Sequence, residues 1–235
     1  EDPDIVALQE VYDGKDPSLE KHFRSYTELK NILGYSYGSY SPAFLNVVLP
    51  PQPIDEGNAV FSKYPILSTV STFYDVPYKQ ITEHDEKQFP YYPRLLQHVI
   101  VELPETKEIL NVFNTHGIWG EDGKDNERRL RMSDTVVTHV KDKPYTILSG
   151  DFNVNQGTQS ITNIEQVMTN IFKDELHSTF NMKQKPPGTG FGVAVVDNIF
   201  ISPDIKVIDH YMPDVNVSDH MPLVAVFEVK GERGK

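Results

Sequence analysis

Short apolar runs recur along the chain and predict β-strands. The run at 5–8 is continuous, which suits a strand buried on both faces. The segment 94–103 instead alternates apolar and polar positions, and with 107–115 it predicts a hairpin. Further strands are expected at 145–151, 195–201 and 221–229, with one or two more within 35–49, where Pro42 interrupts the pattern.

Apolar positions spaced by three or four residues predict helices between these strands. One helix is expected from about Asp16 to Leu33, ended by Gly34. A second is expected from Asp125 to about Val140, and a third around 160–169. The inward face of the second helix is predicted to carry Leu130, Val136, Val137 and Val140. Strands separated by amphipathic helices indicate an α/β layered domain, but periodicity alone does not distinguish a sandwich from a doubly wound sheet.

Residues 73–93 form a long stretch without regular periodicity, in which aromatic residues stand among prolines and charges. An ordered loop of this length needs a reason. Exposed aromatic rings could stack on a base, a sugar or a lipid headgroup, with Tyr78 and Tyr91 as the candidate substrate contacts. The alternative is an Ω-like loop that packs its own aromatic side chains.

Composition excludes several classes of site. The chain has no cysteine, so it can form no disulfide, zinc-thiolate site or cysteine nucleophile. No apolar run approaches about 18 residues, so no transmembrane helix is predicted. A formal net charge of -12 removes bulk attraction to nucleic acid or an anionic membrane, although a bound divalent cation would supply local positive charge. A monomer is expected.

The candidate chemistry lies where predicted strands end. One strand runs into Gly150 and is followed by Asp151 and Asn153, whose spacing in an extended segment would place both side chains on the same side. A Gly-Asp turn alone is common. However, polar residues stand at three other strand ends and inside a fifth apolar run: Glu10, His116, the pair Asp219 and His220, and Asp197.

Taken in order, these five motifs resemble the endonuclease/exonuclease/phosphatase superfamily, which includes pancreatic deoxyribonuclease, abasic-site endonucleases, bacterial sphingomyelinases and inositol-polyphosphate phosphatases. The resemblance runs from Asp4 to about Val229. It rests on Leu-Gln-Glu ending at Glu10, Asn-Thr-His ending at His116, Gly-Asp-Phe-Asn ending at Asn153, and Ser-Asp-His ending at His220.

The resemblance implies one domain over residues 1–230, built as a four-layer α/β/β/α sandwich of two mixed β-sheets flanked by helices. Residues 231–235 are expected to form a tail. The family begins with a strand carrying an Asn, and no residue before Asp4 can supply it. Either this strand lies upstream of Glu1 or the domain is incomplete, and the otherwise intact set of motifs favours the first. The sequence leaves open whether a leader precedes residue 1.

The resemblance further implies hydrolysis of a phosphoester with Mg²⁺ or Mn²⁺. Glu10 would bind the cation, and Asp219 would be a further or water-mediated ligand. Asp151 would orient or deprotonate the attacking water, and Asn153 would hydrogen-bond the phosphate or the nucleophile.

Two histidines complete the implied site. His220 would act on the phosphate or the water, with Asp197 as its orienting partner. His116 would protonate or hydrogen-bond the leaving oxygen, and Glu56 occupies the position of its partner in several family members. Members differ over which histidine is acid and which is base, so the protonic roles stay open.

Substrate contacts are harder to predict. Trp119 is expected beside the cleft, and Arg128 either reaches a substrate phosphate or belongs to a solvated helix face. The substrate could be DNA, RNA, a sphingolipid, an inositol phosphate or a small phosphodiester. The rival interpretation is a binding module that retains the fold without catalysis.

Overall fold

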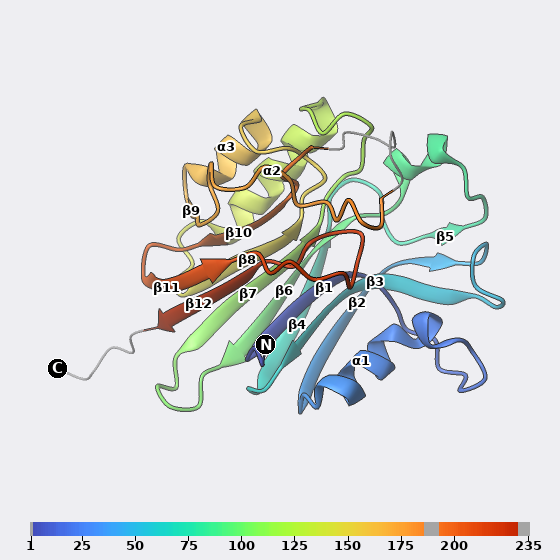
Figure 1. The fold of residues 1–235 in the computed structure, drawn as a ribbon, viewed down its shortest axis with the longest axis horizontal. Helices are drawn as coiled ribbons and strands as arrows, with labels where there is room; N and C mark the ends of the chain where they lie inside the picture. The colour runs from blue at the N-terminus through green and yellow to red at the C-terminus, as the bar shows by residue number, and fades with distance from the viewer. Residues whose placement is uncertain (1, 186–192, 230–235) are drawn as a thin grey trace. The chain divides into compact units, whose positions relative to one another are not determined.

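The computed structural model describes residues 2–185 and 193–229 (Figure 1). The chain divides into two compact units, Glu1–His116 and Gly117–Lys235, called unit 1 and unit 2 below. Each combines β-strands with helices, as expected for the α/β class. The expected tail at 231–235 lies outside the described residues. No helix within the described part of the chain has the length and apolar character to span a membrane.

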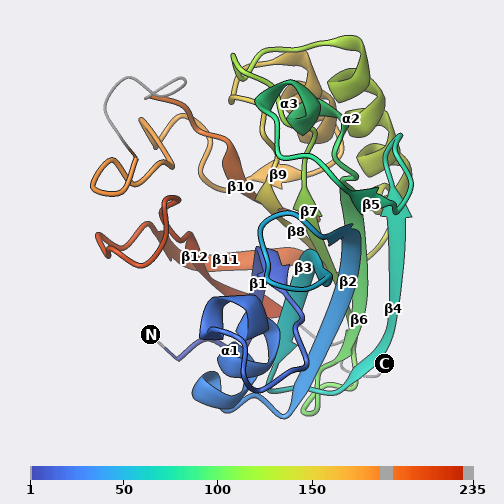
Figure 2. The same ribbon diagram turned by 90° about the vertical axis from the view of Figure 1, so that its right-hand side faces the viewer.

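Unit 1 contains a four-stranded sheet and an antiparallel three-stranded group, β4–β6–β7. The four-stranded sheet has the order β1–β3–β2–β5 and is mixed, because β2 and β5 are parallel while the other pairs are antiparallel. The strands are β1 (Ile5–Tyr12), β2 (Tyr37–Asn46), β3 (Ile54–Ser62), β4 (Ile66–Phe73), β5 (Gln80–Ile81), β6 (Leu95–Glu102) and β7 (Ile109–His116). A 3-10 helix at Lys21–Arg24 leads into α1 (Ser25–Leu33), which packs against β1 (Figure 2).

The start of the first helix differs from the sequence prediction. Asp16 does not cap the helix; its Oδ1 accepts hydrogen bonds from the backbone N and Oγ of Ser18 at 2.9 and 2.7 Å, so the helical turns begin later. Gly34 ends the helix with φ 70, as predicted. Residues 37–46 form one strand, in which Pro42 lies at a register shift against β3.

Unit 2 carries the antiparallel strands β8 (Thr146–Asp151), β10 (Asp197–Ile201) and β9 (Thr169–Asn170), in the order β8–β10–β9. A separate hairpin joins β11 (Ile205–Tyr211) to β12 (Val224–Val229). The helices α2 (Glu127–Val140) and α3 (Gln159–Glu165) lie side by side (Figures 1 and 2).

The buried face of α2 is rotated from the predicted one. The fully buried or nearly buried positions are Arg129, Met132, Ser133, Val136 and Val140, whereas Leu130 and Val137 are half-buried. The helix also begins one residue after Asn126, whose Oδ1 accepts from Arg129 N at 3.0 Å. Asp125, the predicted start, instead accepts hydrogen bonds from Gln159 N and Ser160 N at the first turn of α3.

A buried amide joins the two groups of strands in unit 1. Asn114 on β7 donates through Nδ2 to Leu8 O at 3.0 Å, Ala59 O at 3.2 Å and Gln97 Oε1 at 3.1 Å. Its Oδ1 accepts from Gln9 Nε2 at 2.6 Å, and its side chain has no solvent exposure. Because a buried polar group without a partner is costly, this amide ties β7 to both β1 and β3.

We expect Asn114→Leu to lower the free energy of unfolding by about 2 to 4 kcal/mol, because it leaves two glutamine side chains and two carbonyls without their partner. Chemical denaturation of the whole chain measures this. Asn31→Ala, an exposed amide on α1, is the matched control and should change stability by less than about 0.5 kcal/mol. Equal effects of the two substitutions would show that Asn114 is not a tie between the strands.

Candidate functional site

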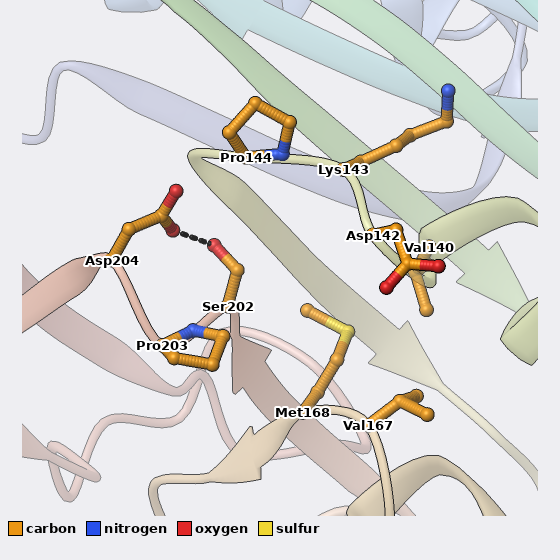
Figure 3. Close-up of a pocket in the computed structure, with 9 residues that line it drawn as sticks. All are labelled: Val140, Asp142, Lys143, Pro144, Val167, Met168, Ser202, Pro203 and Asp204. Atoms are coloured by element: carbon orange, nitrogen blue, oxygen red, sulfur yellow. Dashed lines mark hydrogen bonds between the residues drawn. The ribbon is translucent and has the colours of Figure 1, made fainter.

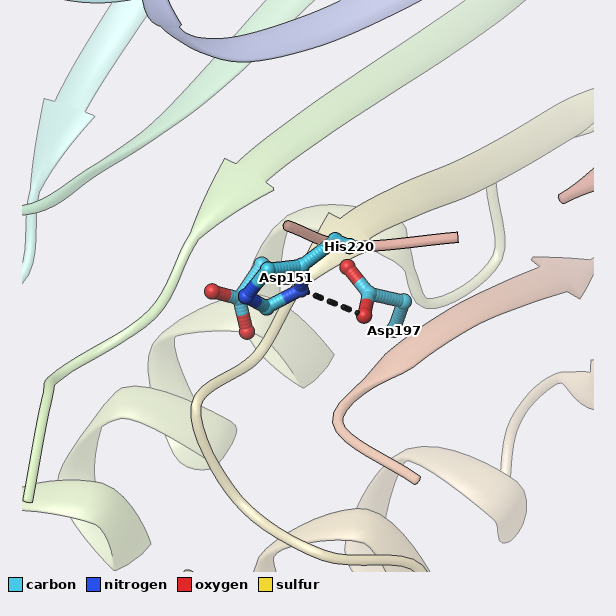
Figure 4. Close-up of side chains that lie close together, drawn as sticks. All are labelled: Asp151, Asp197 and His220. Atoms are coloured by element: carbon cyan, nitrogen blue, oxygen red, sulfur yellow. Dashed lines mark hydrogen bonds and ion pairs between the residues drawn. The ribbon is translucent and has the colours of Figure 1, made fainter. Parts of the chain in front are cut away.

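Three of the predicted site residues gather in unit 2. β8 ends at Asp151 and β10 begins at Asp197, and the antiparallel register places these two residues directly opposite each other. His220 comes from the segment before β12, and its ring lies beside both carboxylates (Figure 4). One ligand atom from each side chain lies within 4.8 Å of the others. The structure therefore brings together residues separated by up to 69 positions in sequence.

Backbone pairing holds His220 in place. Phe180 and His220 form an antiparallel bridge, extended by hydrogen bonds from Met221 N to Thr179 O at 2.8 Å and from Asn181 N to Asp219 O at 2.7 Å. The edge of the Phe180 ring packs against the imidazole, with centroids 4.9 Å apart. The position of the histidine is thus set by a short strand pair rather than by a free loop.

The imidazole of His220 is held in its charged form. Its Nδ1 lies 2.8 Å from Asp197 Oδ2. Burial alone would lower the pKa of His220, but the hydrogen bond and charge of Asp197, followed by the charges of Asp151 and Asp219, raise this pKa to about 9. At neutral pH the ring is therefore an imidazolium whose orientation Asp197 fixes.

Asp151 and Asn153 form a turn rather than the predicted extended segment. Asn153 has a left-handed backbone with φ 55, and its backbone N donates to Asp151 Oδ1 at 2.7 Å. Its side-chain Nδ2 donates to Gly117 O at 3.1 Å, and Gly117 N donates to Asp151 O at 2.7 Å. The prediction was wrong here because aspartate hydrogen-bonds readily to the backbone two residues onward. One oxygen of Asp151 is committed to this turn.

Several supporting residues in unit 2 were missed by sequence reasoning. Thr179 accepts through Oγ1 from Val196 N and Asp197 N at 3.1 and 3.2 Å, which fixes the start of β10. Asn181 is buried and donates to Ser218 O at 2.7 Å, which anchors the segment before His220. Single Thr and Asn residues in irregular stretches have no periodic signal, so no pattern could have revealed them.

The remaining candidates in unit 2 are less enclosed. Asp219 is exposed and accepts from Ser218 Oγ at 3.2 Å, next to His220. Trp119 is half-buried, and Arg128 is half-buried near the start of α2. Their predicted roles stay predictions.

Unit 1 contains a second group of candidates. The buried imidazole of His116 has its Nε2 3.7 Å from Glu10 Oε1. Glu10 has φ 56 and lies at the register shift between Leu8 and Val11, a conformation that costs a non-glycine residue on the order of 1 kcal/mol. Because of this bulge, the Glu10 side chain points in a different direction from the one that regular β-strand alternation would give it. The Glu10 side chain is 65% exposed.

Glu56 lies within β3. It is half-buried, and Asn46 Nδ2 donates to its Oε2 at 3.2 Å. Burial, and then the charge of Glu10, raise the pKa of Glu56. A second hydrogen-bond partner is Tyr12. The predicted pairing of Glu56 with His116 stays a prediction.

Part of the aromatic stretch 73–93 packs against neighbouring strands. Phe73, Phe89 and Tyr92 pack into a cluster with residues of β2 and β6, and the Tyr74 hydroxyl hydrogen-bonds Thr115 Oγ1 at 2.5 Å. Tyr78 and Tyr91 are 45% and 54% exposed. Their predicted contacts with substrate stay predictions.

A divalent cation is chemically compatible with the donors in both units. Mg²⁺ prefers oxygen ligands, and the exposed carboxylate of Glu10 on its bulge supplies them. The spacing of Asp151, Asp197 and His220 could also hold a cation. Because Nδ1 of His220 is committed to Asp197 and the ring is charged, this trio fits proton chemistry better than metal ligation.

A hollow of about 340 Å³ in unit 2 does not belong to this chemistry (Figure 3). It lies at the start of β8, the end opposite Asp151, where Lys143 and Pro144 face the turn after β10. There Ser202 Oγ hydrogen-bonds Asp204, whose other oxygen accepts from Tyr145 N at 2.9 Å. None of the predicted site residues lines this hollow.

A family model matches most of the sequence. The model of the Endonuclease/Exonuclease/phosphatase family matches residues 1–220. No protein of curated description matches the sequence.

Solved structures show the same fold. An endonuclease/exonuclease/phosphatase from Beutenbergia cavernae is 18% identical, with a TM-score of 0.71 over 97% of this chain and 63% of that one. A mannosyl-6-phosphatase from Bacteroides thetaiotaomicron is 19% identical, with a TM-score of 0.64 over 97% and 86%. D. rerio TDP2 complexed with a single-strand DNA product is 14% identical, with a TM-score of 0.63 over 96% and 86%. The expected α/β sandwich class, with mixed sheets flanked by helices, is confirmed. With its family match extending over residues 1–220, the chain belongs to the endonuclease/exonuclease/phosphatase family.

Proposed function

We propose that the chain is a phosphoester hydrolase that depends on Mg²⁺ or Mn²⁺ and acts on phosphodiesters. The observation that carries this proposal is the charged Asp197–His220 pair at 2.8 Å with the carboxylate of Asp151 beside it. Family members are generally phosphoester hydrolases and generally need a divalent metal, which supports the assignment.

Hydrolysis needs a positioned water, donors for the phosphoryl oxygens and help for the leaving oxygen. In unit 2, the charge of the His220 imidazole determines which residue takes each of the first two tasks. His220 is already protonated at neutral pH, so it serves as a donor to a phosphoryl oxygen and not as the base. Asp151 is left as the group that orients the water and accepts its proton. Asn153 shapes the turn that holds this carboxylate.

The residues of unit 1 take the other tasks. His116, beside Glu10, donates to the leaving oxygen. Glu10, in unit 1, is the proposed ligand of the cation. Asp219, in unit 2, is proposed as a further or water-mediated ligand. When bound, the cation supplies positive charge that offsets the negative charge of the phosphoryl oxygens. Glu56 stays the proposed partner of His116.

Substrate class is the finer part of the proposal. Among the related structures, one is described as a mannosyl-6-phosphatase and another as complexed with a single-strand DNA product, so the fold accompanies different phosphoesters. The formal charge of -12 argues against binding a long polyanion by bulk attraction. A small phosphodiester or a locally bound strand fits better.

The first test is hydrolysis of bis-p-nitrophenyl phosphate, plasmid DNA, sphingomyelin and inositol phosphates, with and without EDTA. We expect turnover that EDTA abolishes, and a loss of at least about 100-fold in Asp151→Asn and in His220→Gln. Asp134→Asn and His177→Gln, both exposed in unit 2, are the matched controls and should keep full activity. Turnover that persists in EDTA, or full activity in both Asp151→Ala and His220→Ala, would remove this mechanism.

The second test follows the charge of His220. In the metal-free protein, NMR titration should give an imidazole pKa of about 9. Asp197→Asn should lower this pKa by about 1 to 3 units, because the opposite charge and its hydrogen bond are lost while burial remains. A wild-type pKa near the ordinary value of 6.5 would contradict the proposed donor role.

The same pair predicts a pH-dependent stability. The pKa of His220 is raised on folding, so its contribution is complete below about pH 6.5 and is lost as the pH rises through about 9. The difference in unfolding free energy between wild type and Asp197→Asn should therefore shrink over this range. A difference that stays constant from pH 6 to about pH 10 would show that the charge of His220 does not change there.

The third test concerns the exposed tyrosines of residues 73–93. Tyr91→Ala and Tyr78→Ala should raise KM for the true substrate by roughly 5 to 150-fold, as expected when one base or ring loses its stacking partner. Hydrolysis of a small generic phosphodiester should change little. Tyr78 also donates to Asp55 Oδ1 at 2.6 Å, so Tyr78→Phe separates loss of that bond from loss of the ring. Equal losses on both substrates would indicate structural damage instead.

A further inference from the structure

Arg129 is the one arginine of α2 whose side chain has no solvent exposure. Its neighbours differ: Arg131 forms an exposed ion pair with Glu127 at 2.8 Å, and Arg128 is half-buried. The guanidinium of Arg129 donates to four backbone carbonyls, at 2.5 to 3.3 Å: those of Ile118, Gly120, Lys124 and Asn153.

A buried charge is ordinarily paired with a carboxylate, and Arg129 Nη1 lies 3.5 Å from Oδ1 of Asp122, whose side chain is 61% exposed. The four carbonyls are bound in addition to this ion pair. Arginine offers five donors in a fixed planar fork, which suits it to bridging several carbonyls at once. Here the fork joins residues 118–124 to the turn after β8.

One of these partners, Asn153, also hydrogen-bonds the candidate site residue Asp151. Asn153 O accepts from Arg129 Nη2, while Asn153 N donates to Asp151 Oδ1. The carbonyl and the amide belong to the same residue, which has a left-handed backbone. Any rotation of that residue that weakens the first bond would also move the donor that orients the Asp151 carboxylate.

We infer that Arg129 is a positioning residue, which holds Asn153 so that Asp151 points its carboxylate at the attacking water. It acts through Asn153 and does not touch the substrate. This inference rests on the proposed function in one respect, the role of Asp151. The geometric part, that Arg129 sets the Asn153 turn, stands on the hydrogen bonds alone.

The main experiment compares Arg129→Met with Val136→Ala. Val136 is fully buried on the same face of α2, so its truncation weakens the helix packing without altering the turn. Both variants are assayed with Mg²⁺ on bis-p-nitrophenyl phosphate, well below their melting temperatures. Arg129→Met should lower kcat by about 10 to 100-fold with KM changed less than about twofold, because a small displacement of a reacting group is enough for such a loss. Val136→Ala should keep kcat.

A second variant, which displaces the guanidinium without removing it, keeps the test possible if Arg129→Met does not fold. A Cβ at Gly120 would lie 2.8 Å from Arg129 Nη2 and 3.0 Å from Cζ. Gly120→Ala should therefore push the guanidinium aside without removing it. We expect a kcat loss of a few fold in the same direction, with KM unchanged.

Amide hydrogen exchange gives a readout independent of turnover. The backbone amide of Asn153 should exchange at least about tenfold faster in Arg129→Met and Gly120→Ala than in wild type. Its exchange rate should be unchanged in Val136→Ala. An unchanged kcat in folded Arg129→Met, or equal kcat losses in Val136→Ala, would overturn the positioning role. If wild type hydrolyses no phosphoester, the proposed function fails. Amide exchange alone then tests the geometric part, that Arg129 sets the Asn153 turn. Equal Asn153 exchange in Arg129→Met and Val136→Ala would then overturn that part as well.

Discussion

The hydrogen bond between Asp197 and His220 is the interaction on which the arrangement in unit 2 depends. It joins the start of β10 to the segment before β12. Asp197 is held by its backbone N, which donates to Thr179 Oγ1, and His220 is held by its backbone bridge to Phe180. Burial of an imidazole opposes its protonation, so the ring stays charged only because acidic side chains surround it. The charged ring is therefore a hydrogen-bond donor beside the carboxylate of Asp151.

In both units a buried side-chain donor binds backbone carbonyls of segments distant in sequence. In unit 1 the donor is the amide of Asn114, which binds carbonyls of β1 and β3. In unit 2 it is the guanidinium of Arg129, which binds the carbonyl of Asn153 in the turn after β8. Because such bonds are buried and geometrically strict, they fix the backbone more tightly than exposed ion pairs would.

The strands were largely predictable, because their apolar runs are long enough to report burial. Residues of β1, β6, β7, β8 and β10 fall within the predicted segments, and the polar residues at their ends follow from that. The errors came from side-chain to backbone hydrogen bonds, which periodicity does not represent. Asp16 and Asp151 accept from backbone N atoms two residues onward, those of Ser18 and Asn153. Asp125 accepts from backbone N atoms at the start of α3, more than 30 residues away in sequence.

The arginines of α2 show why the site itself was only partly predictable. Arg128, Arg129 and Arg131 are chemically identical and nearly adjacent, yet a step of one residue turns a helix by about 100°. The apolar pattern placed Leu130 and Val137 on the inward face, whereas the structure leaves both half-buried and buries Arg129 fully. Arg129 is buried because its guanidinium satisfies carbonyls of residues 118–124 and of Asn153, and the helix's own apolar pattern carries no information about those segments.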